Sequence, residues 1–244
     1  MSGHSKWNNI KRRKGAADEK RGRIFSKIGR EIQVAVKEGG PNPEMNSRLR
    51  DAIQNAKDNN MPNDNITRSI KKAAGSGNTE HWEEVTYEGY GPSGVAVIVK
   101  ALTDNRNRTA GEIRHAFDKH GGNLGTTGSV TFMFEDKGEI YIDSEDVDEE
   151  TLMMEALEAG ADDVENIGQA YLITTTPDAY REVRNQLEQN YEIIEGSVGP
   201  VANNFVRLSP EDEEIMQNLI DQLDDSDDVQ HVYHNWESDE TEEE

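Results

Sequence analysis

The segment EIYIDSEDVDEETLMMEALEAGADDVEN, residues 139–166, decides the fold of the second half of the chain. Its apolar spacing changes from strand-like to helical and back, which predicts a strand, a helix and a strand at 139–143, 148–159 and 163–166. The next segment repeats these three elements at 170–176, 178–189 and 192–197. Because the resulting order is βαββαβ, we expect a ferredoxin-like unit here.

Strands and helices also alternate on both sides of this unit. Upstream, strands are expected at 82–88, 94–102 and 129–134, with a helix at 106–119. Downstream, a strand, a helix and a strand are expected at 204–208, 210–223 and 229–235. The simplest account is one α/β domain, residues 80–135 with 201–238, into which the ferredoxin-like domain 136–200 is inserted.

The first 75 residues have a different pattern. Apolar stripes at helical spacing predict three helices, through Ile24, Ile28 and Ile32, then through Met45, Leu49, Ala52 and Ala56, and then through Ile66, Ile70 and Ala73. Residues 1–20 lack this periodicity and are expected to be an arm, so 1–75 is predicted to be a basic arm plus a helical domain. The acidic run 239–244 is expected to be a disordered tail. The fold class is therefore α+β with three domains.

Charge is distributed unevenly between these segments. The chain carries a formal charge of −23, yet residues 1–75 hold 17 Lys and Arg against 8 Asp and Glu, a net of +9, which leaves −32 for the remainder. A basic surface attracts a polyanion through the release of counterions. One interpretation is a nucleic-acid-binding head on an acidic body. The other is a basic segment that docks on its own acidic body.

The candidate nucleic-acid-binding residues come from this basic region. Trp7 could stack on an exposed base or could anchor the arm in the helical core, and both interpretations remain open. The cations need only charge and reach to contact phosphate. They are Lys6, Lys11, Arg12, Arg13 and Lys14 in the arm, and Lys20, Arg21, Arg23, Lys27, Arg30, Arg48 and Lys57 on the predicted helices.

A second group of cations follows the strand at 94–102. Arg106 and Arg108 lie in the expected first turn of the helix 106–119, where positive charge opposes the helix dipole. Because a strand-to-helix turn also offers backbone N–H groups to an anion, this turn is a candidate phosphate site, with Arg114 further along the helix. Internal salt bridges to the acidic body are the alternative.

Motifs for other chemistry are missing. The chain has no cysteine, its six histidines lack metal-site spacing, and the glycine-rich stretch 121–128 lacks the GK[ST] of a phosphate-binding loop. No catalytic residues, metal site or cofactor are therefore predicted, and a carboxylate-based hydrolase is only a remote alternative. No apolar run approaches the length of a membrane span, so we expect no membrane partner. A monomer is favoured, since no dimerisation heptad is evident.

Long stretches resemble the YebC/PmpR family. They are GHSKWNNIKRRKGAADEKRGRIFSKIGREI (3–32), GGPNPEMNSRLRDAIQNAKDNNMPNDNI (39–66), YEGYGPSGVAVIV (87–99), TDNRNRTAGEIRHAFDKHGGNLG (103–125) and GSVTFMF (128–134). The resemblance covers essentially the whole chain and is most specific over 1–135. It implies three domains, with the last inserted in the second, and a cytoplasmic protein without catalytic activity.

The resemblance leaves the nucleic acid open. The family is usually labelled as DNA-binding transcriptional regulators, but it includes a mitochondrial translational activator, and members are linked to ribosomes and to translation of proline-rich stretches. A duplex reader would use a helix such as 44–58, with Arg48, Asn55 and Lys57. A basic arm with an aromatic suits irregular ribosomal RNA better. We therefore expect a nucleic-acid-binding regulator of gene expression, acting on DNA or on ribosomal RNA, with the ribosome as a possible partner.

Overall fold

The computed structural model describes residues 18–75 and 81–237 of the 244-residue chain. Its first part is a unit of three helices, α2 (Asp18–Gly39), α3 (Ser47–Asp58) and α4 (Asn63–Ala74). Their apolar stripes meet in one core that contains Ile28, Ile32, Leu49, Ala56 and Ile66. The three predicted helices are thus confirmed, and each buries the face that its apolar spacing defines.

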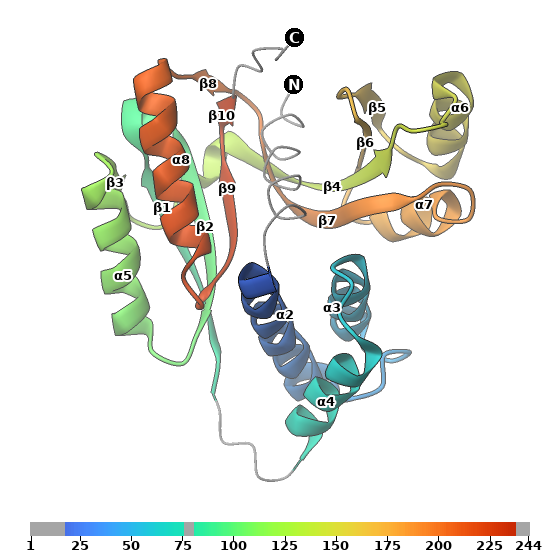
Figure 1. Cartoon of the computed structure of the whole chain (residues 1–244), viewed down its shortest axis with the longest axis horizontal. Coiled ribbons are helices and arrows are strands. Elements are labelled where there is room, and N and C mark those ends of the chain that lie inside the picture. The colour runs from blue at the N-terminus through green and yellow to red at the C-terminus, as the bar shows by residue number, and fades with distance from the viewer. Residues whose placement is uncertain (1–17, 76–80, 238–244) are drawn as a thin grey trace.

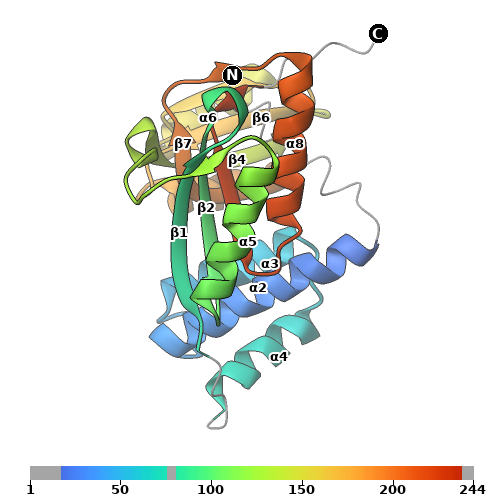
Figure 2. The same cartoon turned by 90° about the vertical axis from the view of Figure 1, so that its left-hand side faces the viewer.

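The next sheet has the strand order β3-β1-β2-β9. Its members are β1 (Glu83–Tyr90), β2 (Ala96–Thr103), β3 (Asn123–Leu124) and β9 (Val229–His234). Helices α5 (Arg106–Lys119) and α8 (Pro210–Asp224) lie side by side on one face, as Figure 2 shows. The first half of strand β2, residues 96–99, is apolar without interruption because it is buried on both faces: Val97 and Val99 pack in the helix-covered core, and Ala96 and Ile98 pack in a second cluster on the other side.

The segment from β4 to β7 forms its own antiparallel sheet, ordered β5-β6-β4-β7. Its elements are β4 (Phe134–Asp143), α6 (Glu149–Ala159), β5 (Asp163–Asn166), β6 (Ala170–Thr175), α7 (Tyr180–Leu187) and β7 (Ile193–Ala202). This is the predicted βαββαβ order, and the ferredoxin-like, inserted arrangement is confirmed. Strands β4 and β7 pair from Phe134 and Ala202 onward, so the chain enters and leaves this unit at the same end.

The three parts surround a common centre, as Figure 1 shows. The two sheets stand on either side, and the helical unit packs against both from one end, with α2 nearer the first sheet and α3 nearer the second. A short parallel pair, β8 (Val206–Arg207) with β10 (Trp236–Glu237), completes the strands among the described residues. The exact domain limits proposed from the sequence stay predictions.

Two local predictions were wrong. Residues 129–134 do not form a separate strand: a 3₁₀ turn occupies Thr131–Met133, and β4 begins at Phe134, because the Glu88 carboxylate binds the backbone N–H groups of this segment. Met45 is not part of the apolar stripe of α3. It is 83% exposed, because Asn46 caps the helix through the N–H of Leu49 and the helix begins only at Ser47.

The N-terminal arm lies largely outside the described residues, but its expected end at residue 20 was placed too late, since α2 already begins at Asp18. No helix in the ranges 18–75 and 81–237 is long and apolar enough to cross a membrane.

Candidate nucleic-acid interface

Several of the predicted contact residues cannot be placed. Lys6, Trp7, Lys11, Arg12, Arg13 and Lys14 lie outside the described residues, and so does the side chain of Lys20. Both interpretations of Trp7 therefore stay as they were. Arg21 is exposed on the first turns of α2.

The cations that follow on α2 contact the acidic end of α8. Arg23 pairs with Asp225 at 2.6 Å, and Lys27 donates to the backbone carbonyl of Asp224 at 2.6 Å. One turn further, Arg30 donates to the carbonyl of Asp227 at 2.5 Å and lies 3.2 Å from a carboxylate oxygen of Asp228. The last carbonyls of a helix lack intrahelical donors and carry partial negative charge, so Lys27 satisfies the end of α8, while Arg23 and Arg30 bind the acidic residues that follow it.

Asp228 is the centre of this contact. It is 4% exposed, and its Oδ2 accepts hydrogen bonds from Arg108 at 2.6 Å, from Thr109 at 2.8 Å and from Thr103 at 3.1 Å. Burial alone would raise the pKa of Asp228, but the hydrogen bonds from Arg108 and Thr109 outweigh it and hold that pKa below its ordinary value. Asp228 thus joins the strand-to-helix turn of residues 103–109 to the cationic face of α2.

The two arginines of this turn have different surroundings. Asn105 caps α5 by accepting from the N–H of Arg108, which starts the helix where the sequence predicts it. The Arg108 side chain pairs with Asp104 at 2.9 Å as well as with Asp228, so it forms the internal salt bridges that were the alternative to phosphate binding. Arg106 and Arg114 are exposed and form no ion pair among the described residues.

Two of the three side chains on α3 that were proposed to read bases bind other residues of this chain. Arg48 binds Glu38 at 2.6 Å and also binds Glu84. Asn55 donates to Glu31 at 3.3 Å. Lys57 is exposed and has no ion pair in the part of the chain that the structure describes.

Helix α4 adds cations at the far end of the helical unit. Arg68 and Lys71 are exposed there, again without an ion pair among residues 18–75 and 81–237. Exposed positive charge in this unit therefore includes the cations of α4 and Lys57, while Arg23, Lys27 and Arg30 of α2 face the acidic body.

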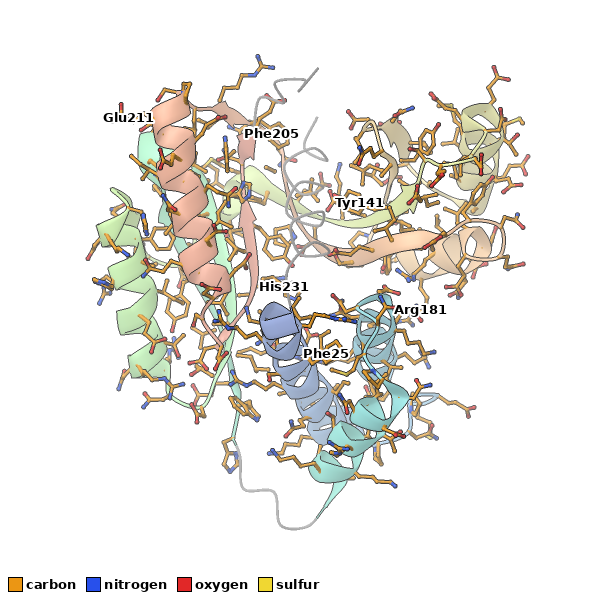
Figure 3. All side chains as sticks on the ribbon, viewed as in Figure 1. Phe25, Tyr141, Arg181, Phe205, Glu211 and His231 are labelled. Carbon is orange, nitrogen blue, oxygen red and sulfur yellow. The ribbon has the colours of Figure 1, made fainter. Side chains whose placement is uncertain are left out.

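The contacts between the helical unit and the inserted sheet were not predicted from the sequence. Arg184 of α7 pairs with Asp58 of α3 at 2.8 Å, and both side chains are buried. Nearby, Arg181 binds both carboxylate oxygens of Asp51, at 2.7 and 2.9 Å, on an exposed surface; Figure 3 shows Arg181 at this junction of α3 and α7. The burial of Arg184 could have been inferred from the sequence, because Arg184 follows Val183 and lies four residues after Tyr180, at the edge of the apolar stripe of α7.

A cleft of about 1210 Å³ opens where α2, α3, β7 and β9 meet. Its walls include the partly exposed apolar side chains Val198 and Phe205. His231 of β9 lies 3.5 Å from Glu31 of α2, which closes one side of the cleft; Figure 3 shows both His231 and Phe205. Within the described ranges no three His, Asp or Glu side chains gather as a metal ion would require.

Comparison with known proteins agrees with this architecture. The family profile "TACO1/YebC protein N-terminal domain" matches residues 5–76, and "TACO1/YebC second and third domain" matches residues 82–236. The crystal structure of a conserved hypothetical protein, Aq1575, from Aquifex aeolicus superimposes with a TM-score of 0.85 at 46% identity, over 94% of this chain and 96% of that one. The three-domain fold with an inserted ferredoxin-like unit is thus a known class, and this chain belongs to the TACO1/YebC family.

Two relatives indicate how the family is named. A protein from Acetivibrio thermocellus is 56% identical over 239 residues, which is 97% of this chain and 99% of the relative. A protein from Ruminiclostridium cellulolyticum is 57% identical over the full length of both. Each bears the name "Probable transcriptional regulatory protein".

Proposed function

We propose that this protein is a non-enzymatic, cytoplasmic regulator of gene expression that binds nucleic acid through its basic N-terminal region. The observation that carries the proposal is the separation of charge, +9 over residues 1–75 against −32 over the remainder. A polyanion is attracted to the first region and repelled by the second, so the charge pattern restricts binding to one end of the molecule. The names of the close relatives support a regulatory role.

The internal contacts of α2 narrow the set of phosphate-binding residues. Arg23, Lys27 and Arg30 already neutralise the end of α8, and Arg108 neutralises Asp228. The affinity for phosphate then rests mainly on the cations of residues 6–14, with Lys57 and the exposed cations of α4 as the supporting surface. Arg106 and Arg114 stay candidates for a second, weaker contact.

A ribosome-associated translation factor that binds ribosomal RNA is the second candidate. The observation that favours it is the state of α3, since Arg48 and Asn55 are engaged with Glu38, Glu84 and Glu31 rather than presented to a major groove. Direct base reading in duplex DNA needs such side chains free to approach base edges. Unpaired RNA can instead be bound by a basic segment and stacking.

Ultraviolet crosslinking in cells tests both forms of the proposal. We expect the tagged protein to crosslink to nucleic acid, and a variant with Lys11, Arg12, Arg13 and Lys14 replaced by Ala to lose most of that signal. Sensitivity of the crosslinked species to ribonuclease or to deoxyribonuclease then assigns RNA or DNA. Absence of crosslinks from the wild-type protein would contradict the proposal.

A further inference from the structure

The loop that runs from the end of α5 to the start of β4, and that includes the short strand β3, has a property that the proposed function does not use. Residues 121–134, GGNLGTTGSVTFMF, contain no charged residue, although 31% of the chain is charged. At the average acidic content of this chain, 49 of 244 residues, such a stretch would carry about three carboxylates. The loop is thus a neutral surface on a strongly acidic body.

The structure fixes this loop from beneath. Glu88 of β1 is 3% exposed, and its carboxylate accepts from the backbone N–H groups of Gly128 at 2.7 Å, Val130 at 2.9 Å and Thr131 at 3.0 Å. Burial would raise the pKa of Glu88, but these hydrogen bonds outweigh it and hold the pKa below its ordinary value, so the carboxylate stays ionised at neutral pH. Tyr90 adds a hydrogen bond to the carbonyl of Ser129 at 3.1 Å.

The outer side of the fixed loop presents one aromatic ring. Val130 is fully buried and holds the loop against Ala96 and Ile98, whereas Phe132, two residues on, is 72% exposed. It is the most exposed aromatic side chain among the described residues. Thr126, Thr127 and Thr131 are also exposed on the loop and can donate and accept hydrogen bonds. Because the loop backbone is fixed before binding, it loses little conformational entropy when a partner arrives.

We infer that Phe132 is a stacking platform for an unpaired nucleobase, and that the loop 121–134 is a second nucleic-acid contact. This inference rests on the proposed function. The loop itself carries no carboxylate, and the carboxylate of Glu88 beneath it is buried and hydrogen-bonded to the loop backbone, so the loop repels phosphates less than the rest of the acidic body does. The absence of cations means that the loop gains affinity from the base and not from the backbone, as in aromatic platforms for single strands.

The position of the loop determines how long a nucleic acid must be to reach both the loop and the helical unit. The loop is bonded to Glu88 and Tyr90 at one end of β1, whereas the contact of α2 with Asp228 lies at the other end, near Thr103, which pairs with Glu83. Eight residues of strand separate these ends by about 23 Å. A single strand of about 20 nucleotides is therefore long enough to reach both the loop and the helical unit.

The test uses the full-length protein and a fluorescein-labelled, unstructured oligoribonucleotide of about 20 nucleotides, alone and as a duplex. Loss of one stacked base, about 1–3 kcal/mol, predicts that Phe132→Ala weakens binding of the single strand about five- to 150-fold. Binding of the duplex stays unchanged, and Phe132→Trp restores single-strand affinity. Met154→Ala on α6 is the matched control, because Met154 is 61% exposed and lies outside this loop.

The other outcomes separate the inference from the proposed function. If Phe132→Ala binds the single strand as wild type does, the inference is overturned and the proposed function stands. In that case, a protein that copurifies with wild type but not with Phe132→Ala would assign the loop to a protein partner. If Phe132→Ala weakens single strand and duplex equally, stacking on an unpaired base is wrong. If wild type binds neither the single-stranded nor the duplex oligoribonucleotide, the inference fails, and the RNA-binding form of the proposed function fails with it.

Discussion

Replacing Arg184 by Ala should strongly destabilise the junction between the helical unit and the inserted sheet. The side chains of Arg184 and Asp58 are only 5% and 9% exposed, their charged atoms are 2.8 Å apart, and burial raises the pKa of Asp58. Removing Arg184 leaves a buried carboxylate without its counter-charge, a change that costs about 3–5 kcal/mol. Urea unfolding at neutral pH, followed by circular dichroism, measures this as a loss of unfolding free energy.

The neighbouring exposed pair is a matched control. Arg181 and Asp51 connect the same two helices at 2.7 Å, but their side chains are 45% and 59% exposed. Arg181→Ala should therefore cost only about 0–1 kcal/mol. Replacing Asp58 and Arg184 together by Leu should recover most of the stability, because two apolar groups leave no buried charge. Equal, small effects of Arg181→Ala and Arg184→Ala would show that the buried pair contributes no more to stability than the exposed one.

Three further changes should alter stability. Burial lowers the pKa of His234 to about 4 from 6.5, so below pH 6.5 the unfolded chain binds a proton that the folded chain does not. The free energy of unfolding should therefore fall by at most about 3 kcal/mol down to pH 4. Unfolding curves taken across that range should show that His234→Gln abolishes this dependence on pH. The pKa of Asp228 is held below 3.8, so its ionised form should stabilise the fold fully above about pH 4, and this stabilisation should be lost as the pH falls through the lowered pKa. Asp228→Asn should therefore make the melting temperature less dependent on pH in the acid range. Gly138→Ala should cost about 1–3 kcal/mol in urea unfolding, because its Cβ would overlap Thr175 and Tyr180.

The elements of the fold could be predicted where local signals agree. Helix α5 begins at Arg106 and ends at Lys119 as expected, because Asn105 caps one end and Gly121 and Gly122 follow the other. The βαββαβ unit was visible because strand and helix periodicities alternate cleanly over 139–197. The turn at Thr131–Met133 was not, because the carboxylate that holds it belongs to Glu88, more than 40 residues earlier.

The candidate site shows the same limit. The excess of positive charge in residues 1–75 can be counted from the sequence, but the partner of each cation cannot. Arg23 pairs with Asp225, 202 residues away, and Arg184 pairs with Asp58, 126 residues away. Such pairs depend on how three domains pack, for which a single sequence carries no local signal.

The salt dependence of nucleic-acid binding measures how many phosphates the N-terminal cations contact. The measurement compares the full-length protein with the variant that carries Ala at Lys11, Arg12, Arg13 and Lys14, using fluorescence anisotropy over a range of salt concentrations. If these residues contact phosphates, binding weakens strongly, and the slope of log K against log salt becomes shallower by about 0.7 for single strands or 0.9 for duplex per lost contact. Equal affinity and equal slope for the two proteins would contradict the account.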